Sequence, residues 1–213
     1  MTIEIKSLTL GAVATNSYLI GDTETAEAML IDPVDDAPLL NKTAQDAGWT
    51  IKLILATHGH FDHILASQPL KELTDAPFAI HEAEVGWLRS LPQQGMMFFG
   101  SPFPEAATPD RFLTTEPEII ELGAIYLETI FTPGHSPGHI SFYMPSHKMV
   151  FSGDCLFAGS IGRTDLPGAD FTTLINTIWD KLLPLGDDVK VMCGHGDPTT
   201  IGDERRTNPF LQF

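Results

Sequence analysis

The sequence is poor in cysteine and in basic residues. Of its 213 residues only Cys155 and Cys193 are cysteines, too few for a disulfide framework, so we expect both to be reduced packing residues, as in a cytoplasmic protein. Lysine and arginine together number 12 against 28 acidic residues, which gives a formal net charge of −16. Nucleic acids and anionic membrane surfaces are bound by clustered basic side chains, so this composition argues against both kinds of partner.

Long hydrophobic runs are also missing. No stretch approaches the roughly 18 apolar residues of a membrane span. The first twenty residues lack the basic start, apolar core and cleavage site of a signal peptide, so we interpret them as mature protein. The composition is otherwise ordinary for a globular protein, 43% hydrophobic and 19% charged. We expect a single domain over residues 1–213, located in the cytoplasm.

Apolar patterning predicts strands and helices in an order that favours a layered α/β arrangement. The expected strands are 3–10, 16–21, 27–33, 50–56, 118–122, 124–131, 139–144, 148–152 and 188–193, and the expected helices are 35–48, 64–73 and 170–183. A further strand and helix are expected within 77–91. Residues 92–117 are rich in proline and glycine and lack a clear period. We expect a long surface connection there, with residues 96–99 packed on the core or closing over a site.

One short stretch carries most of the chemistry. After the apolar run "LILA", the segment "THGHFDH" places His58, His60, Asp62 and His63 within six positions. In an extended chain, side chains at i, i+2 and i+4 point the same way, so the first three project to one side at the end of a strand. Imidazole nitrogen and carboxylate oxygen are ligands that zinc and similar divalent ions prefer, and without an ion several of these groups would need buried partners. We therefore predict a metal site.

Three later segments repeat one design, a strand followed by glycine and then a candidate ligand. "FTPGHSPGH" offers His135 and His139, "VFSGDC" offers Asp154, and "VMCGHGD" offers His195. Strand ends gathered at one edge of a sheet are where α/β folds build their sites. We expect the remaining metal ligands to come from these segments.

Together these motifs resemble the metallo-β-lactamase superfamily, whose His-x-His-x-Asp-His signature is similar to "THGHFDH". The resemblance covers essentially the whole chain. It implies a four-layer αββα sandwich that holds two divalent ions, zinc first, with iron or manganese as alternatives. It also implies that a water or hydroxide is shared between the ions. The residues that match the family's ligands are His58, His60 and His135 for one ion, Asp62, His63 and His195 for the other, and Asp154 as the bridge.

Within the superfamily, the chain is most similar to short bacterial glyoxalase II-type proteins. The stretches "TPGHSPGH", "FSGD" and "GSIGRTDLPGAD" and the tail "GDERRTNPFL" carry this resemblance. It implies hydrolysis of a hydroxyacylglutathione such as S-D-lactoylglutathione to glutathione and a hydroxy acid. Long glyoxalase II enzymes have a C-terminal helical domain that supplies much of the glutathione site, and we expect no such domain in this chain.

Other branches of the superfamily fit the motifs less well. Diiron oxygen-reducing members carry Glu where this chain has His60, true β-lactamases generally lack an acidic residue at the position of Asp154, and nuclease branches carry extra domains or basic surfaces. "GRTD" is shared with persulfide dioxygenases, so a mononuclear-iron enzyme acting on glutathione persulfide is one alternative. A metal-binding protein without turnover is another.

The resemblance also implies a mechanism. Asp62 and Asp154 are the candidate catalytic residues, since their carboxylates would hold ions that lower the pKa of water towards ~7 and polarise the thioester carbonyl. The ions would leave a local positive charge that favours an anionic substrate. We expect a small-molecule thioester, derived from glutathione, as the substrate, and a monomer or small homo-oligomer as the functional form.

Three further residues have two interpretations each. Arg163 can bind a substrate carboxylate through its planar guanidinium, or it can pair with Asp165. Asp32 can orient a metal ligand from behind, or it can form a turn into the following helix. His139 is expected to support the structure rather than to contact a metal ion.

Overall fold

In the computed structural model, which describes residues 3–212, the chain divides into two compact units. One unit comprises the chain up to Leu113 together with Glu121–Ile125, and the other comprises Thr114–Ile120 and the chain from Tyr126 onward. A six-stranded sheet forms the centre of each unit. Among the described residues, no helix is both long and apolar enough to cross a membrane.

The first unit is built on a sheet that is antiparallel at one side and parallel at the other. Across the sheet lie, in chain order, β1 (Ile3–Leu10), β2 (Thr15–Asp22), β3 (Glu27–Ile31), β4 (Thr50–Leu55), β5 (Phe78–His81) and β6 (Arg111–Leu113). β1 to β3 form an antiparallel meander, whereas β3 to β6 run parallel. Because parallel strands end at the same edge, the residues that follow β3, β4 and β5 are brought together there.

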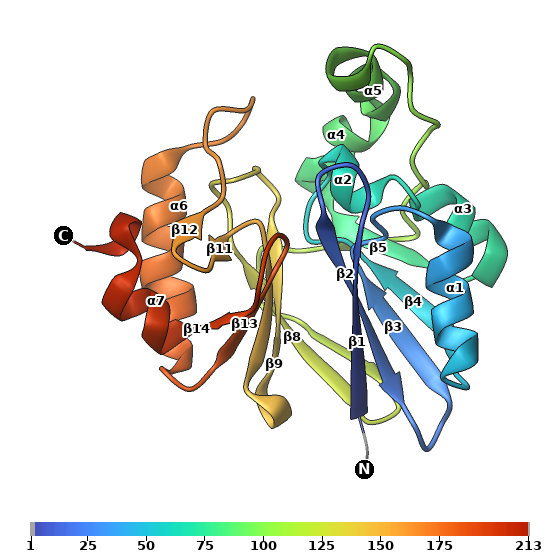
Figure 1. The fold of residues 1–213 in the computed structure, drawn as a ribbon, viewed down its shortest axis with the longest axis horizontal. Helices are drawn as coiled ribbons and strands as arrows, with labels where there is room; N and C mark the ends of the chain where they lie inside the picture. The colour runs from blue at the N-terminus through green and yellow to red at the C-terminus, as the bar shows by residue number, and fades with distance from the viewer. Residues whose placement is uncertain (1–2, 213) are drawn as a thin grey trace. The chain divides into compact units, whose positions relative to one another are not determined.

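The helices of the first unit are α1 (Ala37–Asp46), α2 (Phe61–Ile64), α3 (Ser67–Thr74), α4 (Val85–Arg89) and α5 (Leu91–Phe99), with a 3₁₀ turn, η1 (Glu82–Glu84). α1 begins where the Asp36 side chain accepts a hydrogen bond from the Leu39 N–H, and Pro38 occupies its first turn. Figure 1 shows α1 and α3 side by side on one face of this sheet. Their apolar sides, including Leu40 and Leu70, join one core with Ile54 of β4.

The second unit repeats this plan with a sheet of mixed direction. The strands of this second sheet are β7 (Ile119–Leu122), β8 (Ile125–Phe131), β9 (Ile140–Met144), β10 (Met149–Gly153), β13 (Lys190–Cys193) and β14 (Thr199–Thr200), and a small hairpin consists of β11 (Leu156–Phe157) and β12 (Ser160–Ile161). The end of β7 and the first residue of β8 fall within Glu121–Ile125, which is grouped with the first unit. The order across the sheet is β14-β13-β10-β9-β8-β7. The pair β10–β13 is parallel, whereas β8–β9 and β9–β10 are antiparallel.

The helices of the second unit cover one face of its sheet (Figure 1). They are α6 (Phe171–Thr177), continued by η3 (Ile178–Leu182) and η4 (Leu183–Leu185), and α7 (Ile201–Thr207), with 3₁₀ turns η2 (Pro145–His147) and η5 (Pro209–Leu211). α6 begins where Asp170 accepts a hydrogen bond from the Thr173 N–H. Leu174 and Ile178 of this helical segment pack against Val150 and Val191 of the central strands.

The prediction of an irregular surface connection over residues 92–117 is wrong in part, because this segment contains most of α5 and all of β6. Pro92 lies in the first turn of α5, and Gly100 ends the helix in a left-handed conformation, φ 74°. Gly95 lies inside the helix because a Cβ there would approach Phe103 N to 2.4 Å. The expected helix over 64–73 is also divided, since α2 ends and α3 begins around Leu65.

Two leucines of α3 test whether the buried side of this helix stabilises the first unit. Leu70 is fully buried in the core, whereas Leu73 is 51% exposed. We expect Leu70→Ala to lower the free energy of unfolding by about 2–5 kcal/mol, since it removes buried methyl groups and leaves a cavity. Leu73→Ala, the matched control on the same helix, should change it by less than about 0.5 kcal/mol. Urea denaturation measures both, and equal losses would contradict the packing described.

Candidate metal centre

The histidine motif of the first unit lies where three parallel strands end. Asp32 follows β3, Thr57 and His58 follow β4, and Glu84 lies in η1 directly after β5. All four side chains are buried. A buried polar group needs hydrogen-bond partners, so the bonds among these side chains and to the motif's backbone determine the shape of the site.

The carboxylate of Asp32 fixes two of the histidines. It accepts hydrogen bonds from the Thr57 backbone N–H (2.7 Å), the Thr57 hydroxyl (2.9 Å) and His63 Nδ1 (2.8 Å). Because the Thr57 hydroxyl donates its proton to Asp32, it accepts one from His58 Nδ1, 3.0 Å away. Both imidazoles therefore carry the proton on Nδ1 and the lone pair on Nε2, as metal-binding histidines commonly do. Asp32 thus orients His63 directly and His58 through Thr57. This is the first of the two interpretations given for Asp32 above.

The backbone of the motif is held by side chains from η1 and α5. The Gly59 N–H donates a hydrogen bond to Glu84 Oε2 (2.9 Å), and the Phe61 N–H donates one to Gln94 Oε1 (3.0 Å). A Cβ at Gly59 would lie 2.7 Å from Trp87 Cβ, so a larger residue does not fit between the two histidines without a shift. Glu84 and Gln94 lie outside every motif of the sequence, and no local pattern identifies them.

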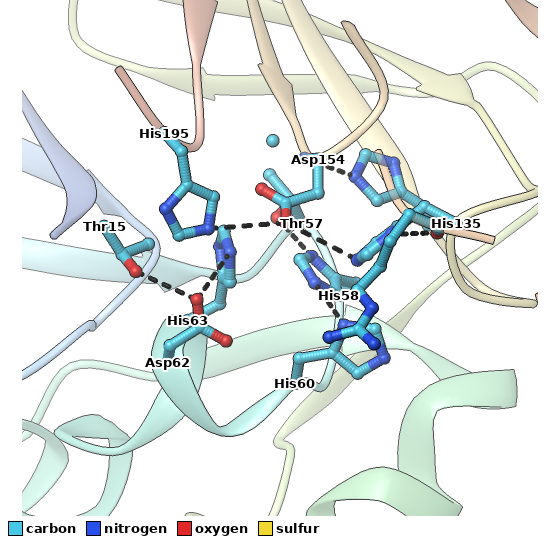
Figure 2. A network of polar contacts seen from close by, with 12 residues as sticks. Thr15, Thr57, His58, His60, Asp62, His63, His135, Asp154 and His195 are labelled. Carbon is cyan, nitrogen blue, oxygen red and sulfur yellow. Dashed lines mark hydrogen bonds and ion pairs between the residues drawn. The ribbon is translucent and has the colours of Figure 1, made fainter. Parts of the chain in front are cut away.

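The remaining donors of the first unit lie within ligand distance of the oriented histidines. Asp62 Oδ2 accepts a hydrogen bond from the Thr15 hydroxyl (2.9 Å) and lies 3.6 Å from His63 Nε2 (Figure 2). His58 Nε2 and His60 Nδ1 lie 3.0 Å apart. Two ligands about 2.0–2.2 Å from a zinc ion in tetrahedral geometry lie about 3.3–3.6 Å apart. The separation of Asp62 and His63 fits this value.

The second unit also presents three donors at strand ends, as the sequence predicts. Asp154 follows β10, and His195 comes two residues after the parallel strand β13. The Gly194 N–H donates a hydrogen bond to the Gly153 carbonyl (2.8 Å), which joins these two strand ends. His135 lies in the loop between β8 and β9, and β8 runs in the same direction as β10 because both are antiparallel to β9.

Within the second unit, Asp154 lies between the two histidines. Its Oδ2 atom is 3.5 Å from His135 Nε2 and 3.4 Å from His195 Nε2 (Figure 2). Both distances exceed those of good hydrogen bonds, but they equal the spacing of two ligands on one zinc ion. A carboxylate oxygen flanked by two imidazole nitrogens is a donor arrangement suited to divalent metal ions.

Hydrogen bonds distinguish His135, a candidate ligand, from His139, whose ring supports the backbone of Asp154. His135 Nδ1 donates to the Arg163 carbonyl oxygen (2.8 Å), so its lone pair lies on Nε2. His139 Nε2 instead accepts a hydrogen bond from the Asp154 backbone N–H (3.1 Å), and its Nδ1 donates to the Thr132 hydroxyl (2.8 Å). The Nε2 lone pair of His139 is thus used to hold the backbone of Asp154. His139 is a supporting residue, as expected.

The stretch "GSIGRTD" packs directly against these donors. A Cβ at Gly162 would lie 1.9 Å from the Asp154 carbonyl oxygen and 3.0 Å from His135 Nδ1. The next residue, Arg163, supplies the carbonyl that orients His135. Its guanidinium donates two hydrogen bonds to the Asp165 carboxylate (2.7 and 2.8 Å), which lower the pKa of Asp165 to about 2. The structure therefore shows Arg163 paired with Asp165, the second of its two interpretations. A contact between Arg163 and a substrate stays a prediction.

The other conspicuous titratable residues do not supply donors in this arrangement. Burial raises the pKa of the Cys193 thiol to about 12 and raises that of Cys155 as well, so both stay protonated near neutral pH and pack in the core. His81 is buried, and its Nδ1 accepts the Ala83 N–H in the turn after β5. His147 lies exposed in η2.

Comparison with known proteins identifies the family. Residues 10–195 match the model of the metallo-β-lactamase superfamily, and the chain belongs to that superfamily. The α/β metallo-β-lactamase-like fold class predicted from the sequence is confirmed. Together, the family and the donor sets of the two units identify a metal-dependent hydrolase that uses divalent ions.

Several relatives are similar over nearly their whole length. A Haemophilus influenzae protein named hydroxyacylglutathione hydrolase GloC is 43% identical, over 99% of this chain and 98% of that protein. A Bacillus subtilis protein named probable metallo-hydrolase YqgX is 37% identical, over 97% and 96%. Among solved structures, the BLEG-1 B3 metallo-β-lactamase has a TM-score of 0.92 at 39% identity, covering 99% of this chain and 100% of its own. The structure of TTHA1623 in a di-iron-bound form has a TM-score of 0.87 at 39% identity, covering 97% of this chain and 100% of its own.

Asp32 provides a test of how the first unit's donors are oriented. We expect Asp32→Asn to weaken zinc binding about 10- to 100-fold, because the amide removes the charge behind His63 and cannot accept all three hydrogen bonds. Asn also tolerates the left-handed backbone found at Asp32, φ 58°. Asp36→Asn is the matched control, since Asp36 has the same backbone conformation, φ 48°, but caps α1. Chelator competition measures both affinities, and an unchanged affinity in Asp32→Asn would refute this role.

Proposed function

We propose that the chain is a dinuclear metal-dependent hydrolase of thioesters, of the glyoxalase II type. The observation that carries the proposal is the orientation of the histidines. In His58, His63 and His135, Nδ1 is bonded to a protein acceptor, so Nε2 is the atom offered to a metal ion. Such orientation in both units supports ion binding by both sets of donors.

The proposed ligand assignment follows the family pattern. We propose that one ion is held by three histidines, that a second is held by a carboxylate and two histidines, and that one carboxylate is shared. These residues are His58, His60 and His135 for the first ion, Asp62, His63 and His195 for the second, and Asp154 between them. Zinc is the proposed metal, with iron or manganese as alternatives; one solved relative is in a di-iron-bound form.

The proposed reaction is the addition of water across the acyl–sulfur bond. When bound, the two ions would lower the pKa of water towards ~7 and polarise the thioester carbonyl. Asp62 and Asp154 would balance part of the positive charge of the ions. The Thr15 hydroxyl orients the Asp62 carboxylate, and His139 holds the backbone of Asp154. The acyl carbon gains the oxygen of water as the carbon–sulfur bond breaks, and the sulfur leaves as a thiolate, which needs no strong general acid because it is a good leaving group. Of the two protons of water, the thiolate takes up one, and the other is released to solvent as the product ionises to a carboxylate.

The proposed substrate is a hydroxyacylglutathione such as S-D-lactoylglutathione. The name of the Haemophilus influenzae relative supports this choice. Two ions carry four positive charges, more than Asp62 and Asp154 return, so the site would attract the carboxylates of glutathione despite the net charge of −16. Arg163 remains a candidate contact for one of them. We further propose that the two units act as a single domain, as a monomer or small homo-oligomer, in the cytoplasm.

The metal stoichiometry tests the dinuclear assignment. We expect zinc-reconstituted protein to hold about two ions per chain, as two-metal hydrolases do. Asp154→Asn should lower turnover more than about 100-fold, beyond the usual effect of an outer partner, because it removes the shared ligand. His139→Ala should keep both ions and lose less activity, since His139 Nε2 bonds the backbone N–H of Asp154 and His139 is not a proposed ligand. Elemental analysis showing one ion or none, or equal losses in the two variants, would contradict the assignment.

The reaction itself is tested by comparing substrates on one preparation. We expect zinc-loaded protein to hydrolyse S-D-lactoylglutathione without oxygen, and iron-loaded protein to consume little oxygen with glutathione persulfide. Thioester cleavage and oxygen uptake are measured under both metal loadings, with chelator-treated protein as the control. Rapid persulfide-dependent oxygen uptake without thioester hydrolysis would favour a mononuclear-iron dioxygenase. Metal binding without any turnover would favour a non-catalytic protein.

Hydrolysis of β-lactams is a second candidate, favoured by one observation. The solved B3 metallo-β-lactamase is 39% identical to this chain with a TM-score of 0.92. Both reactions add water to an acyl carbon, but a β-lactam releases an amine rather than a thiolate. A cephalosporin assay on the same zinc-loaded preparation distinguishes them. Cephalosporin hydrolysis with a higher kcat/KM than that of the thioester would make the β-lactam the preferred substrate.

A further inference from the structure

A small apolar pocket opens in the first unit beside Asp62. Its volume is about 200 Å³, and Asp62 is itself one of the residues that line it. The apolar lining comes from the β1–β2 turn, the segment after β3, α2, α5 and the segment after α5. The side chains that supply it are Ala12, Val34, Phe61, Leu65, Phe99 and Phe103.

Three aromatic rings form one wall of this pocket. The ring centroids of Phe61 and Phe99 are 5.5 Å apart, those of Phe61 and Phe103 are 5.6 Å apart, and those of Phe99 and Phe103 are 5.3 Å apart. Such separations are typical of aromatic pairs that stabilise each other. Gly95 allows the backbone at Phe103 to lie directly against α5, so the position of Phe103 in this wall is set by close packing.

The polar groups of the pocket select against an anion. Carboxylates line it at two positions, Asp35 and Asp62. The Asp35 carboxylate is oriented by the backbone N–H of Asp36, 2.7 Å away. A glutathione moiety carries two carboxylates, and bringing one beside Asp35 would cost electrostatic energy. The pocket therefore suits the uncharged end of a thioester rather than its glutathione end.

We propose that this pocket binds the acyl group of the substrate and that the enzyme accepts thioesters with an apolar acyl group of about phenyl size. This inference rests on the proposed function, because it assigns a binding pocket to the acyl group of the proposed thioester substrate. A dry cavity of about 150 Å³ binds benzene, so a 200 Å³ pocket accommodates a phenyl ring or a short alkyl chain. Asp62 itself lines the pocket, so a group bound there lies next to a proposed metal ligand.

Phe99 and Phe98 provide a matched pair of variants. Both side chains are 46% exposed at the end of α5, and both rings lie 5.5 Å from Phe61, but only Phe99 lines the pocket. The kcat/KM of S-phenylacetylglutathione is measured relative to that of S-D-lactoylglutathione. Phe99→Ala should lower this ratio about 10-fold, in the range of one hydrophobic contact, because it removes part of the wall. Phe98→Ala should change the ratio by less than about twofold.

A binding measurement separates this inference from the proposed reaction. Phenylacetamide, a neutral probe, is titrated into the metal-loaded full-length protein and followed by ligand-observed NMR. Phe99→Ala should weaken its binding several-fold, and Phe98→Ala should not. An unchanged ratio and unchanged binding in Phe99→Ala, or equal losses in both variants, would overturn the pocket assignment. If no thioester is hydrolysed, the proposed function fails, and phenylacetamide binding alone decides whether the pocket takes an apolar group.

Discussion

The hydrogen bonds to Asp32 are the constraint on which the first unit's donors depend. A buried carboxylate needs partners, and here it receives one backbone N–H, one hydroxyl and one imidazole N–H. The bond to His63 places the proton of that imidazole on Nδ1. The bond to the Thr57 hydroxyl does the same for His58, because this hydroxyl then accepts a hydrogen bond from His58 Nδ1. Asp32 lies at the end of β3, and its backbone N–H bonds to Leu55 of β4, so the parallel pairing of two strands places the carboxylate behind the histidines.

The second unit reaches the same result by different means. The Arg163 carbonyl oxygen accepts a hydrogen bond from His135 Nδ1, and His139 Nε2 accepts one from the Asp154 backbone N–H, so neither of these orienting groups is a carboxylate. Close packing at Gly162 makes these contacts possible, because a side chain there would collide with Asp154. In both units the proposed ligands are therefore oriented by residues outside the proposed ligand set.

The sequence predicts the longer strands, and the position of the candidate ligands after them, because both are local signals. Apolar runs that end in glycine or in a polar cluster predict β4, β10 and β13 and the donors that follow them. α5 is missed because it is nine residues long and contains Gly95, which is explained only by the distant Phe103. Glu84 and Gln94 are missed for a similar reason, since each bonds a backbone N–H more than twenty residues away. The assignment of seven ligands to two ions comes from the family resemblance, not from spacing in the sequence.

α5 links the chemistry of the first unit to its apolar pocket. Gln94, on this helix, accepts a hydrogen bond from the backbone N–H of Phe61, whereas the ring of Phe99, five residues later, packs against the ring of Phe61. A change at Gln94 would remove a hydrogen bond from the segment that carries Asp62. A change at the half-exposed Phe99 alters the pocket wall while that backbone bond stays in place. The proposed acyl specificity can therefore be altered at the end of α5 while the hydrogen bond from Phe61 to Gln94 stays in place, because the pocket wall and this bond depend on different side chains of the same short helix.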